Sequence, residues 1–252
     1  MTGGGGTLIL LRHGESEANA SGLFGGWAVY RLTLRGEEQA ADAARLIAQA
    51  GLLPDVAHTS LLQRSIRTAE IVLGHLGRSW IPVRRTWRLN ERQYGALTGR
   101  SKQEIRQAVG AEQYVIWRRS LHGRPPPLAS DRLALLRADP RYATLPGEGV
   151  PAVESFSDVV ARVRPYWADA VAPALVRGST ALICAHGNSL RALVSLLDRL
   201  DESAVPALDI PTAEPLLYTV TPDVQPWPPG GRYLAPDRAR VAAQAVAAEG
   251  HS

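Results

Sequence analysis

Two segments that lie far apart in the chain share a layout that suits phosphate chemistry. Each begins with an apolar run, continues with His-Gly and leads into polar residues: Leu11-Arg-His-Gly-Glu-Ser16 contains His13, and Ala185-His-Gly-Asn-Ser189 contains His186. Glycine after a histidine allows a bound group to approach the backbone, and the first turn of a following helix offers N–H groups to an anion. Arg12 adds a guanidinium that can bind phosphate oxygens through two hydrogen bonds. Together these residues predict a phosphate pocket.

A metal site is the main alternative for the two histidines. No cluster of carboxylates flanks them, and the cationic Arg12 would repel a metal ion, so we expect none to bind there. Cys184 is the only cysteine, which excludes an intramolecular disulfide and any multi-cysteine metal site. It lies in an apolar run and is expected to be a small buried residue. The other histidines are expected in the core or on the surface: His58, His75, His122 and His251.

Further motifs extend this pattern along nearly the whole chain. In order, they are Thr59-Ser-Leu-Leu-Gln-Arg-Ser-Ile-Arg-Thr-Ala69, Trp87-Arg-Leu-Asn-Glu-Arg-Gln-Tyr-Gly95, Trp117-Arg-Arg-Ser120, Pro125-Pro-Pro127, Ala185-His-Gly-Asn-Ser-Leu-Arg-Ala-Leu193 and Ile210-Pro-Thr212. With Arg12-His13-Gly14, these motifs resemble the histidine phosphatase superfamily and, within it, the cofactor-dependent phosphoglycerate mutases. The resemblance implies interconversion of 3-phosphoglycerate and 2-phosphoglycerate through a phosphohistidine.

The resemblance also implies a role for each matching residue. His13 corresponds to the nucleophile, Glu91 to the general acid/base, and Arg12, Arg64 and His186 to the phosphate pocket. The substrate-binding residues that it implies are Asn19, Gly25, Gly26, Arg92, Tyr94, Lys102, Arg118, Arg119, Gly187 and Asn188. Spacing alone leaves other possibilities open: Glu91 could pair with Arg88 or Arg92, and two adjacent arginines on a helix often face solvent.

Lys102 and the Arg118-Arg119 pair favour a mutase over a simple phosphatase. Lys102 is the only lysine in a chain that otherwise uses arginine, and a mutase needs a second anion subsite to retain a doubly phosphorylated intermediate. The resemblance implies 2,3-bisphosphoglycerate as the priming phosphoryl donor, no metal, a small phosphorylated substrate, and a homodimer or homotetramer.

Several substrate-side positions depart from the family pattern. Gly25 stands where the family has threonine, Gln93 where histidine is common, and Ala213 and Glu214 where it has Gly-Ile. Glu214 would place an additional negative charge near a site for anions. Gly25 and Glu214 favour the alternative function, a phosphatase of the same superfamily acting on a small phosphorylated metabolite.

The elements that must position these residues are strands alternating with helices. We expect strands at about 7–11, 55–58, 80–83, 180–185 and 216–220, and helices at about 37–50, 62–75, 101–120 (interrupted near Gly110), 155–176 and 189–200. This order predicts a three-layer α/β/α sandwich with a mostly parallel sheet. We expect one domain over residues 1–252, a helical and loop-rich insertion at about 98–150, and a flexible C-terminal tail at about 228–252.

Composition is that of a globular protein rather than a nucleic-acid or membrane protein. The formal net charge is +4 and the isoelectric point is near 9.6, but the basic residues are scattered and no aromatic residues are interleaved with them. The residues before Thr7 lack the features of a signal peptide, and no apolar run is long enough for a membrane span. We therefore expect a cytoplasmic protein that binds neither nucleic acid nor membranes.

Overall fold

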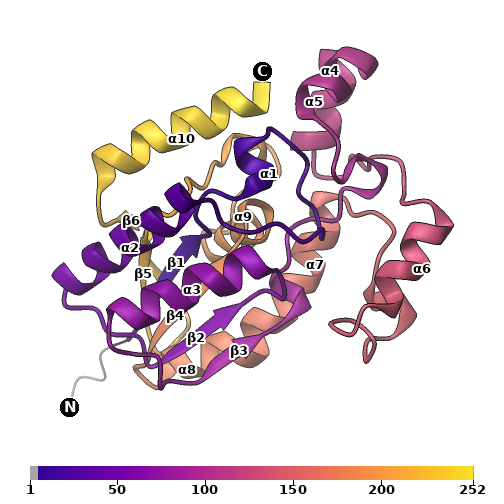
Figure 1. The fold of residues 1–252 in the computed structure, drawn as a ribbon. Helices are drawn as coiled ribbons and strands as arrows, with labels where there is room; N and C mark the ends of the chain where they lie inside the picture. The colour runs from indigo at the N-terminus through magenta and orange to yellow at the C-terminus, as the bar shows by residue number, and fades with distance from the viewer. Residues whose placement is uncertain (1–4, 252) are drawn as a thin grey trace.

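The computed structural model describes residues 5–251 and has a six-stranded mixed sheet at its centre (Figure 1). The strand order is β3-β2-β4-β1-β5-β6. The strands are β1 (Gly6–Arg12), β2 (Val56–Thr59), β3 (Val83–Arg85), β4 (Thr180–Ala185), β5 (Leu216–Val220) and β6 (Pro226–Tyr233). Strands β3, β2, β4 and β1 run parallel, whereas β5 and β6 are added in antiparallel orientation.

Helices cover both faces of the sheet, which confirms the predicted α/β/α layers. Helices α2 (Leu34–Gln49) and α3 (Gln63–His75) pack on one face, and α7 (Phe156–Tyr166), α8 (Ala172–Val176) and α9 (Gly187–Leu197) pack on the other. Successive residues of β1 alternate between the two cores: Leu8 and Leu10 face α7–α9, while Ile9 and Leu11 face α2 and α3. Because both faces of β1 are buried, its residues are apolar at successive positions instead of alternating between apolar and polar.

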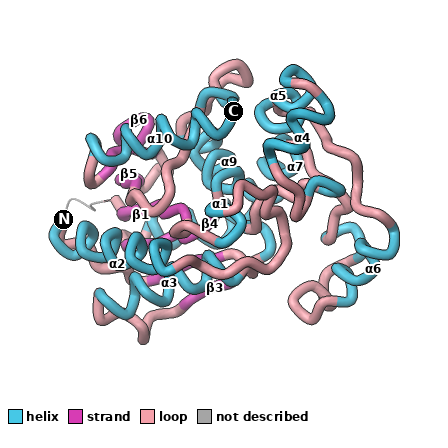
Figure 2. The backbone as a smooth tube through the Cα atoms, turned by 45° about the horizontal axis from the view of Figure 1, so that its top comes forward, coloured by secondary structure: helices cyan, strands magenta, loops and turns pink. Residues whose placement is uncertain are grey.

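A second group of helices extends beyond the sheet (Figures 1 and 2). It consists of α4 (Lys102–Val109), α5 (Ala111–Arg119) and α6 (Ser130–Ala138). Gly110 separates α4 from α5 with φ of 83°, a left-handed conformation that favours glycine. Helix α6 falls within the stretch expected to be loop-rich. Its apolar residues do not gather on one clear face of the helix, and none of its residues is fully buried.

The segments predicted least well lie in the C-terminal half. The long helix at 155–176 is interrupted by a π-helical segment, η4 (Trp167–Val171), which follows Pro165. Strand β6 was not predicted because it is rich in proline and glycine; it lies at the sheet edge, where such residues are tolerated. Helix α10 (Pro236–His251) then crosses above the sheet and contacts α5 (Figure 1).

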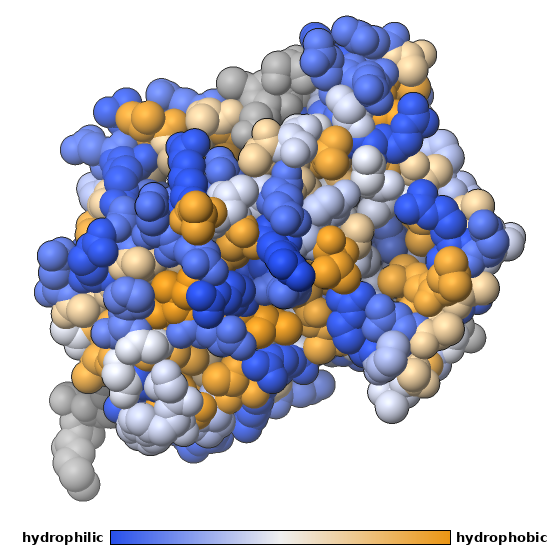
Figure 3. All heavy atoms as spheres, viewed as in Figure 1, coloured by the Kyte–Doolittle hydropathy of each residue, from blue (hydrophilic) through white to orange (hydrophobic). Residues whose placement is uncertain are grey.

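The remaining helical turns are short and lie near the pocket or in loops. They are α1 (Glu17–Ala20) and the 3₁₀ turns η1 (Trp87–Leu89), η2 (Gly95–Leu97), η3 (Gly147–Gly149) and η5 (Val205–Ala207). On the face shown in Figure 3, apolar residues occur in small groups separated by hydrophilic ones. Within residues 5–251, no helix is both long enough and apolar enough to cross a membrane.

Candidate active site

The structure brings the two His-Gly segments together at the carboxyl ends of neighbouring strands. Strands β1 and β4 are paired in parallel, with Arg12 opposite Ala185, and the backbone N–H of His13 donates to the Ala185 carbonyl at 3.0 Å. The rings of His13 and His186 meet edge to face, with their centroids 4.9 Å apart. Because both strands are held by the sheet, the two imidazoles have a fixed relation to each other.

His13 is held as a neutral imidazole with one nitrogen available. Its Nδ1 lies 2.7 Å from the carbonyl oxygen of Gly14, which can only accept a hydrogen bond, so Nδ1 carries the proton and Nε2 keeps its lone pair. Burial lowers the pKa of His13 well below its usual value, and the charges of Arg64 and Arg12 lower it further. A neutral imidazole of this kind can attack an electrophilic phosphorus atom.

His186 lies behind His13 and is anchored from a third strand. Its Nε2 is 2.7 Å from the hydroxyl of Ser60, which follows β2. Burial and the neighbouring Arg64 lower the pKa of His186 well below its usual value. The two imidazoles can therefore stay uncharged beside guanidinium groups without mutual repulsion.

Two arginines supply positive charge beside His13. Arg64, from α3, is buried and donates to the carbonyls of Ala28 at 3.1 Å and Gly26 at 2.9 Å, and burial lowers its pKa to about 10. Arg64 therefore remains a cation at neutral pH. Arg12 donates to the Ile210 carbonyl at 2.9 Å, and its buried Nε has no hydrogen-bond partner among the described residues. An oxyanion would satisfy this donor.

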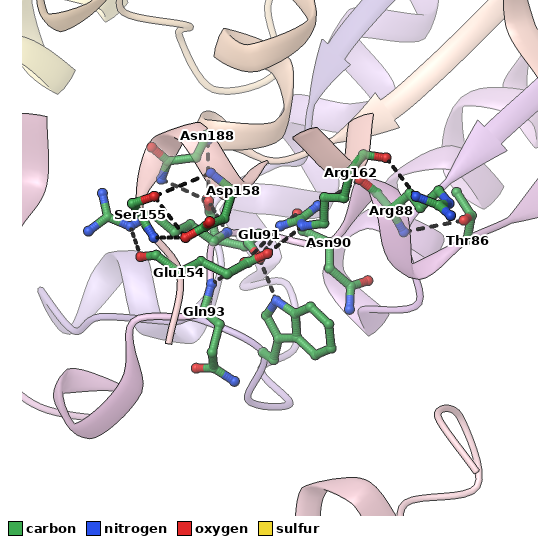
Figure 4. Close-up of polar contacts among 12 residues, drawn as sticks. Thr86, Arg88, Asn90, Glu91, Gln93, Glu154, Ser155, Asp158, Arg162 and Asn188 are labelled. Carbon is green, nitrogen blue, oxygen red and sulfur yellow. Dashed lines mark hydrogen bonds and ion pairs between the residues drawn. The ribbon is translucent and has the colours of Figure 1, made fainter. Parts of the chain in front are cut away.

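Glu91 faces the same pocket from an irregular segment after η1. Its Oε1 accepts hydrogen bonds from the Asn188 side chain at 2.8 Å and from the backbone N–H of Arg92 at 2.7 Å (Figure 4). Within residues 5–251, no ion pair joins Glu91 to Arg88 or to Arg92, so the salt-bridge alternative is not realised. A Cβ added to Gly187 would lie 3.7 Å from Glu91 Oε2 and 3.8 Å from Arg12 Cζ, so this carboxylate and this guanidinium both border the start of α9.

A second set of cations lines the outer part of the pocket. Lys102 comes from the start of α4, and Arg118 and Arg119 come from the end of α5. Arg119 forms an ion pair with Asp209 at 2.8 Å. The full lining is Arg12, His13, Ser16, Ala18, Asn19, Leu23, Phe24, Gly25, Arg64, Glu91, Tyr94, Lys102, Arg118, Arg119, Gly187, Asn188, Arg191, Asp209, Ile210 and Val246.

The predicted pocket residue His186 is fully buried, and neither it nor two of the predicted substrate-binding residues line this pocket. Gly26 lies behind Arg64 and presents its carbonyl to it. Arg92 is fully buried; it donates to the carbonyls of Glu154 at 3.0 Å and Gly123 at 3.3 Å, and to that of Trp117. The guanidinium of Arg92 thus joins three backbone segments outside the pocket lining, and its buried Nη1 has no hydrogen-bond partner among the described residues.

The structure also adds pocket residues that the sequence did not single out. Arg191 of α9 is buried, donates to Asn188 Oδ1 at 3.0 Å and to the Val205 carbonyl at 2.8 Å, and has a pKa lowered to about 10 by burial. The spacing of three residues from Asn188 places both on one helix face, a signal that could have identified it. Val246 gave no such signal, because only the fold-back of α10 brings it to the pocket.

Glu214 does not place an uncompensated charge in the pocket. Its carboxylate forms an ion pair with Arg238 of α10 at 2.6 Å, and Glu214 does not belong to the lining around His13. Burial raises the pKa of Glu214, while Arg238 opposes that shift. Ala213 has φ of 55°, a conformation that suits the glycine usual at this position in the family.

The arrangement can transfer a phosphoryl group between His13 Nε2 and an oxygen atom. The cations neutralise phosphate charge, and Glu91 is the carboxyl group that lines the inner end near Arg12 and Gly187. No cluster of three or more His, Cys, Asp or Glu side chains that could hold a metal ion occurs among the described residues.

Comparisons with known proteins identify relatives for nearly the whole chain. A family model described as "Histidine phosphatase superfamily (branch 1)" matches residues 8–225. The chain is 54% identical over 244 residues to the 2,3-bisphosphoglycerate-dependent phosphoglycerate mutase of Thermobifida fusca, covering 97% of this chain and 99% of that one. It is 52% identical to the protein of the same name from Streptomyces griseus, covering 96% of each chain.

Solved structures share the fold at lower identity. Mycobacterial glucosyl-3-phosphoglycerate phosphatase has a TM-score of 0.66 and 25% identity, with 84% of this chain and 92% of that chain covered. Bacillus stearothermophilus YhfR has a TM-score of 0.64 and 24% identity, with 90% and 93% covered. The likeness in sequence to the mutases is thus far greater than the likeness to these two solved structures.

Proposed function

The chain belongs to the histidine phosphatase superfamily, and from this premise we propose that it is a 2,3-bisphosphoglycerate-dependent phosphoglycerate mutase. It interconverts 3-phosphoglycerate and 2-phosphoglycerate. One observation carries the proposal: a single pocket joins the neutral His13 to a second set of cations, Lys102, Arg118 and Arg119. A hydrolase needs only the inner phosphate site, whereas a mutase must hold a second anionic group while phosphoryl groups are exchanged.

In this proposal, His13 carries the phosphoryl group on Nε2. When that group moves to the free hydroxyl of the substrate, the P–N bond breaks, the P–O bond forms, and Glu91 takes the hydroxyl proton. In the reverse sense, Glu91 returns a proton to the departing ester oxygen as the other phosphoryl group bonds to Nε2. Arg12 and Arg64 offset the charge on the phosphoryl oxygens.

The pocket residues fit the cofactor named for the relatives. A doubly phosphorylated, carboxylated three-carbon acid carries several negative charges, and the lining supplies cations at both ends together with the unsatisfied Nε of Arg12. When bound, 2,3-bisphosphoglycerate would supply the phosphoryl group that first loads His13. Arg191, by holding Asn188, would keep the inner wall in place.

Partners and location follow from the same proposal. The substrate is a small phosphorylated acid, and neither nucleic acid nor membrane is needed for the reaction. We place the enzyme in the cytoplasm, where charged phosphate esters of this kind are retained, and we propose a homodimer or homotetramer.

A phosphorus NMR time course tests the proposal directly. Purified protein, freed of divalent metal by a chelator, is given 3-phosphoglycerate and a trace of 2,3-bisphosphoglycerate. A 2-phosphoglycerate signal that grows to a plateau with little inorganic phosphate is the expected result. Steady release of inorganic phosphate without the isomer would overturn the mutase assignment in favour of a phosphatase, and activity that requires added metal would contradict the mechanism.

A further inference from the structure

The segment that carries Glu91 has no regular secondary structure of its own. It lies between the 3₁₀ turns η1 (Trp87–Leu89) and η2 (Gly95–Leu97), outside the sheet that fixes His13 and His186. A proton-transferring carboxyl group must nevertheless be held within hydrogen-bond reach of the reacting oxygen. Something other than a strand or helix must therefore position this backbone.

Arg162, on α7, binds the backbone immediately before and at Glu91 (Figure 4). Its guanidinium donates to the carbonyls of Arg88 at 2.6 Å, Asn90 at 2.9 Å and Glu91 at 3.0 Å. These bonds use the planar set of donors that only arginine offers.

Glu154 completes the arrangement from the other side. Its carboxylate accepts from Arg162 Nε at 2.7 Å and from Nη2 at 3.1 Å, and it also accepts from the backbone N–H of Gln93 at 2.8 Å. The side chains of Arg162 and Glu154 are only 5% and 3% exposed. The buried ion pair thus holds the chain on both sides of Glu91.

The pair is in turn fixed to the helices that carry the rest of the site. Ser155 caps the N-terminus of α7 together with Asp158, which accepts from the Ser155 N–H at 2.7 Å. Helix α7 packs against α9, whose first residues include Asn188, the partner of the Glu91 carboxylate. Helix α7 therefore fixes the position of the Glu91 backbone relative to α9.

We infer that Glu154 and Arg162 form a positioning pair that holds the Glu91 carboxyl group in place for proton transfer. The inference rests on the proposed acid/base role of Glu91. Burying an ion pair contributes little net stability in general, because desolvation offsets the attraction. What an apolar pair of similar size could not provide is the set of hydrogen bonds to the backbone at Arg88, Asn90, Glu91 and Gln93.

The dependence of the rate on the leaving group distinguishes a positioning role of Glu154 and Arg162 from a merely structural one. Return of a phosphoryl group from the bisphosphorylated intermediate to His13 expels an alkoxide that needs a proton, whereas p-nitrophenyl phosphate releases a stable phenolate that does not. In Arg162→Lys and Glu154→Gln, we expect kcat on 3-phosphoglycerate to fall on the order of 10- to 100-fold with KM nearly unchanged. The first, pre-steady-state release of p-nitrophenolate, which reports only the loading of His13, should change in rate by less than about threefold.

The control variant is Tyr218→Phe, which removes a hydroxyl that donates to Asp198 at 2.9 Å from another buried position. Neither of these residues lines the pocket. Each variant is assayed well below its measured melting temperature, and Glu154→Gln, which keeps the side-chain shape, serves if Arg162→Lys does not fold. Equal losses on both esters, or no loss on either, would overturn the positioning role.

The same assays distinguish failure of the inference from failure of the proposed function. If the wild-type protein releases phosphate from 3-phosphoglycerate but makes no 2-phosphoglycerate, the mutase assignment fails. The comparison of alkyl and aryl esters then still decides whether the pair positions Glu91.

Discussion

The two ends of the pocket are built in different ways. The inner end, around His13 and His186, stands on paired strands, and its groups are almost fully buried. The outer end contains Lys102 and Arg118, which lie on short helices that extend beyond the sheet (Figure 1). The C-terminal helix α10 also contributes Val246 to the pocket lining. This difference suggests that the sheet positions the residues that transfer the phosphoryl group, whereas the helices carry the residues that bind the rest of the substrate.

The largest effect is expected at the inner end. His13→Ala removes the proposed phosphoryl carrier, so turnover should fall by about 10⁴-fold or more, as is typical when a nucleophile is lost. The measurement is the rate of 2-phosphoglycerate formation together with acid-labile, base-stable protein phosphorylation. The exposed His75 provides the control variant, His75→Gln, which should retain both. Retained turnover in His13→Ala would remove the inner end from the chemistry.

At the outer end, Arg118→Gln should separate binding from chemistry. Losing one cation of the second subsite is expected to raise KM for 3-phosphoglycerate on the order of 10- to 100-fold. Phosphorylation of His13 should continue, and the fraction of phosphate lost to water should rise. Arg137→Gln, an exposed arginine on α6 that does not line the pocket, is the matched control. If Arg118→Gln abolished phosphorylation of His13, the two ends would not be separable.

The same contrast explains what the sequence allowed to be predicted. Strands β1 and β4 are largely apolar, and each is followed directly by His-Gly, so the placement of His13 and His186 follows from the rule for parallel sheets. Near the outer end, the fold depends on contacts between distant segments. Val246 reaches the pocket only because α10 folds back, a consequence that no local pattern contains.

Two further differences have the same physical origin. Arg92 lies next to Glu91 in the chain and is a cation in a motif for anions, yet the fold turns it toward backbone carbonyls outside the pocket lining. Helix α6 was missed because a helix with no fully buried residue has little amphipathic pattern. The sequence therefore indicated which residues are charged, whereas tertiary packing determined the direction in which the charged side chain of Arg92 points.

Acid should weaken the fold through its buried histidines. Burial lowers the pKa of His13 and His186, and it lowers the pKa of His58 to about 4, whereas in the unfolded chain the value is near 6.5. Below that value the unfolded state binds more protons, so the free energy of unfolding falls as pH decreases from about 6.5 toward the lowered folded values.

Each histidine should contribute up to about 1.4 kcal/mol per pH unit in this window, roughly tenfold in the folding equilibrium. Urea denaturation of the unphosphorylated protein between pH 7 and pH 5 measures it. A free energy of unfolding that stays constant over this range would mean that the buried imidazoles accept protons in the folded state, contrary to their surroundings. His75→Gln should leave the slope unchanged.

The smallest expected effect concerns the ion pair between Glu214 and Arg238, which joins the loop beside Arg12 to α10. Glu214 is buried and Arg238 is 44% exposed, so the pair is worth at most about 1 kcal/mol. Glu214→Gln should loosen α10, admit water near Val246 and raise the ratio of inorganic phosphate to 2-phosphoglycerate about two- to fivefold. Phosphorus NMR gives this ratio directly. Arg240→Gln, which breaks the exposed contact with Asp237 within α10, should leave it unchanged.

The direction of this change decides between two roles for Glu214. If the carboxylate acts as part of a contact that holds α10, both Glu214→Gln and Arg238→Gln should raise the ratio, because either one weakens the same ion pair. If instead its negative charge repels the anionic substrate, Glu214→Gln should lower the ratio while Arg238→Gln raises it. The first result would show that α10 helps to exclude water from the outer end of the pocket, which also binds anions. The second would show that Glu214 weakens substrate binding although it lies outside the pocket lining.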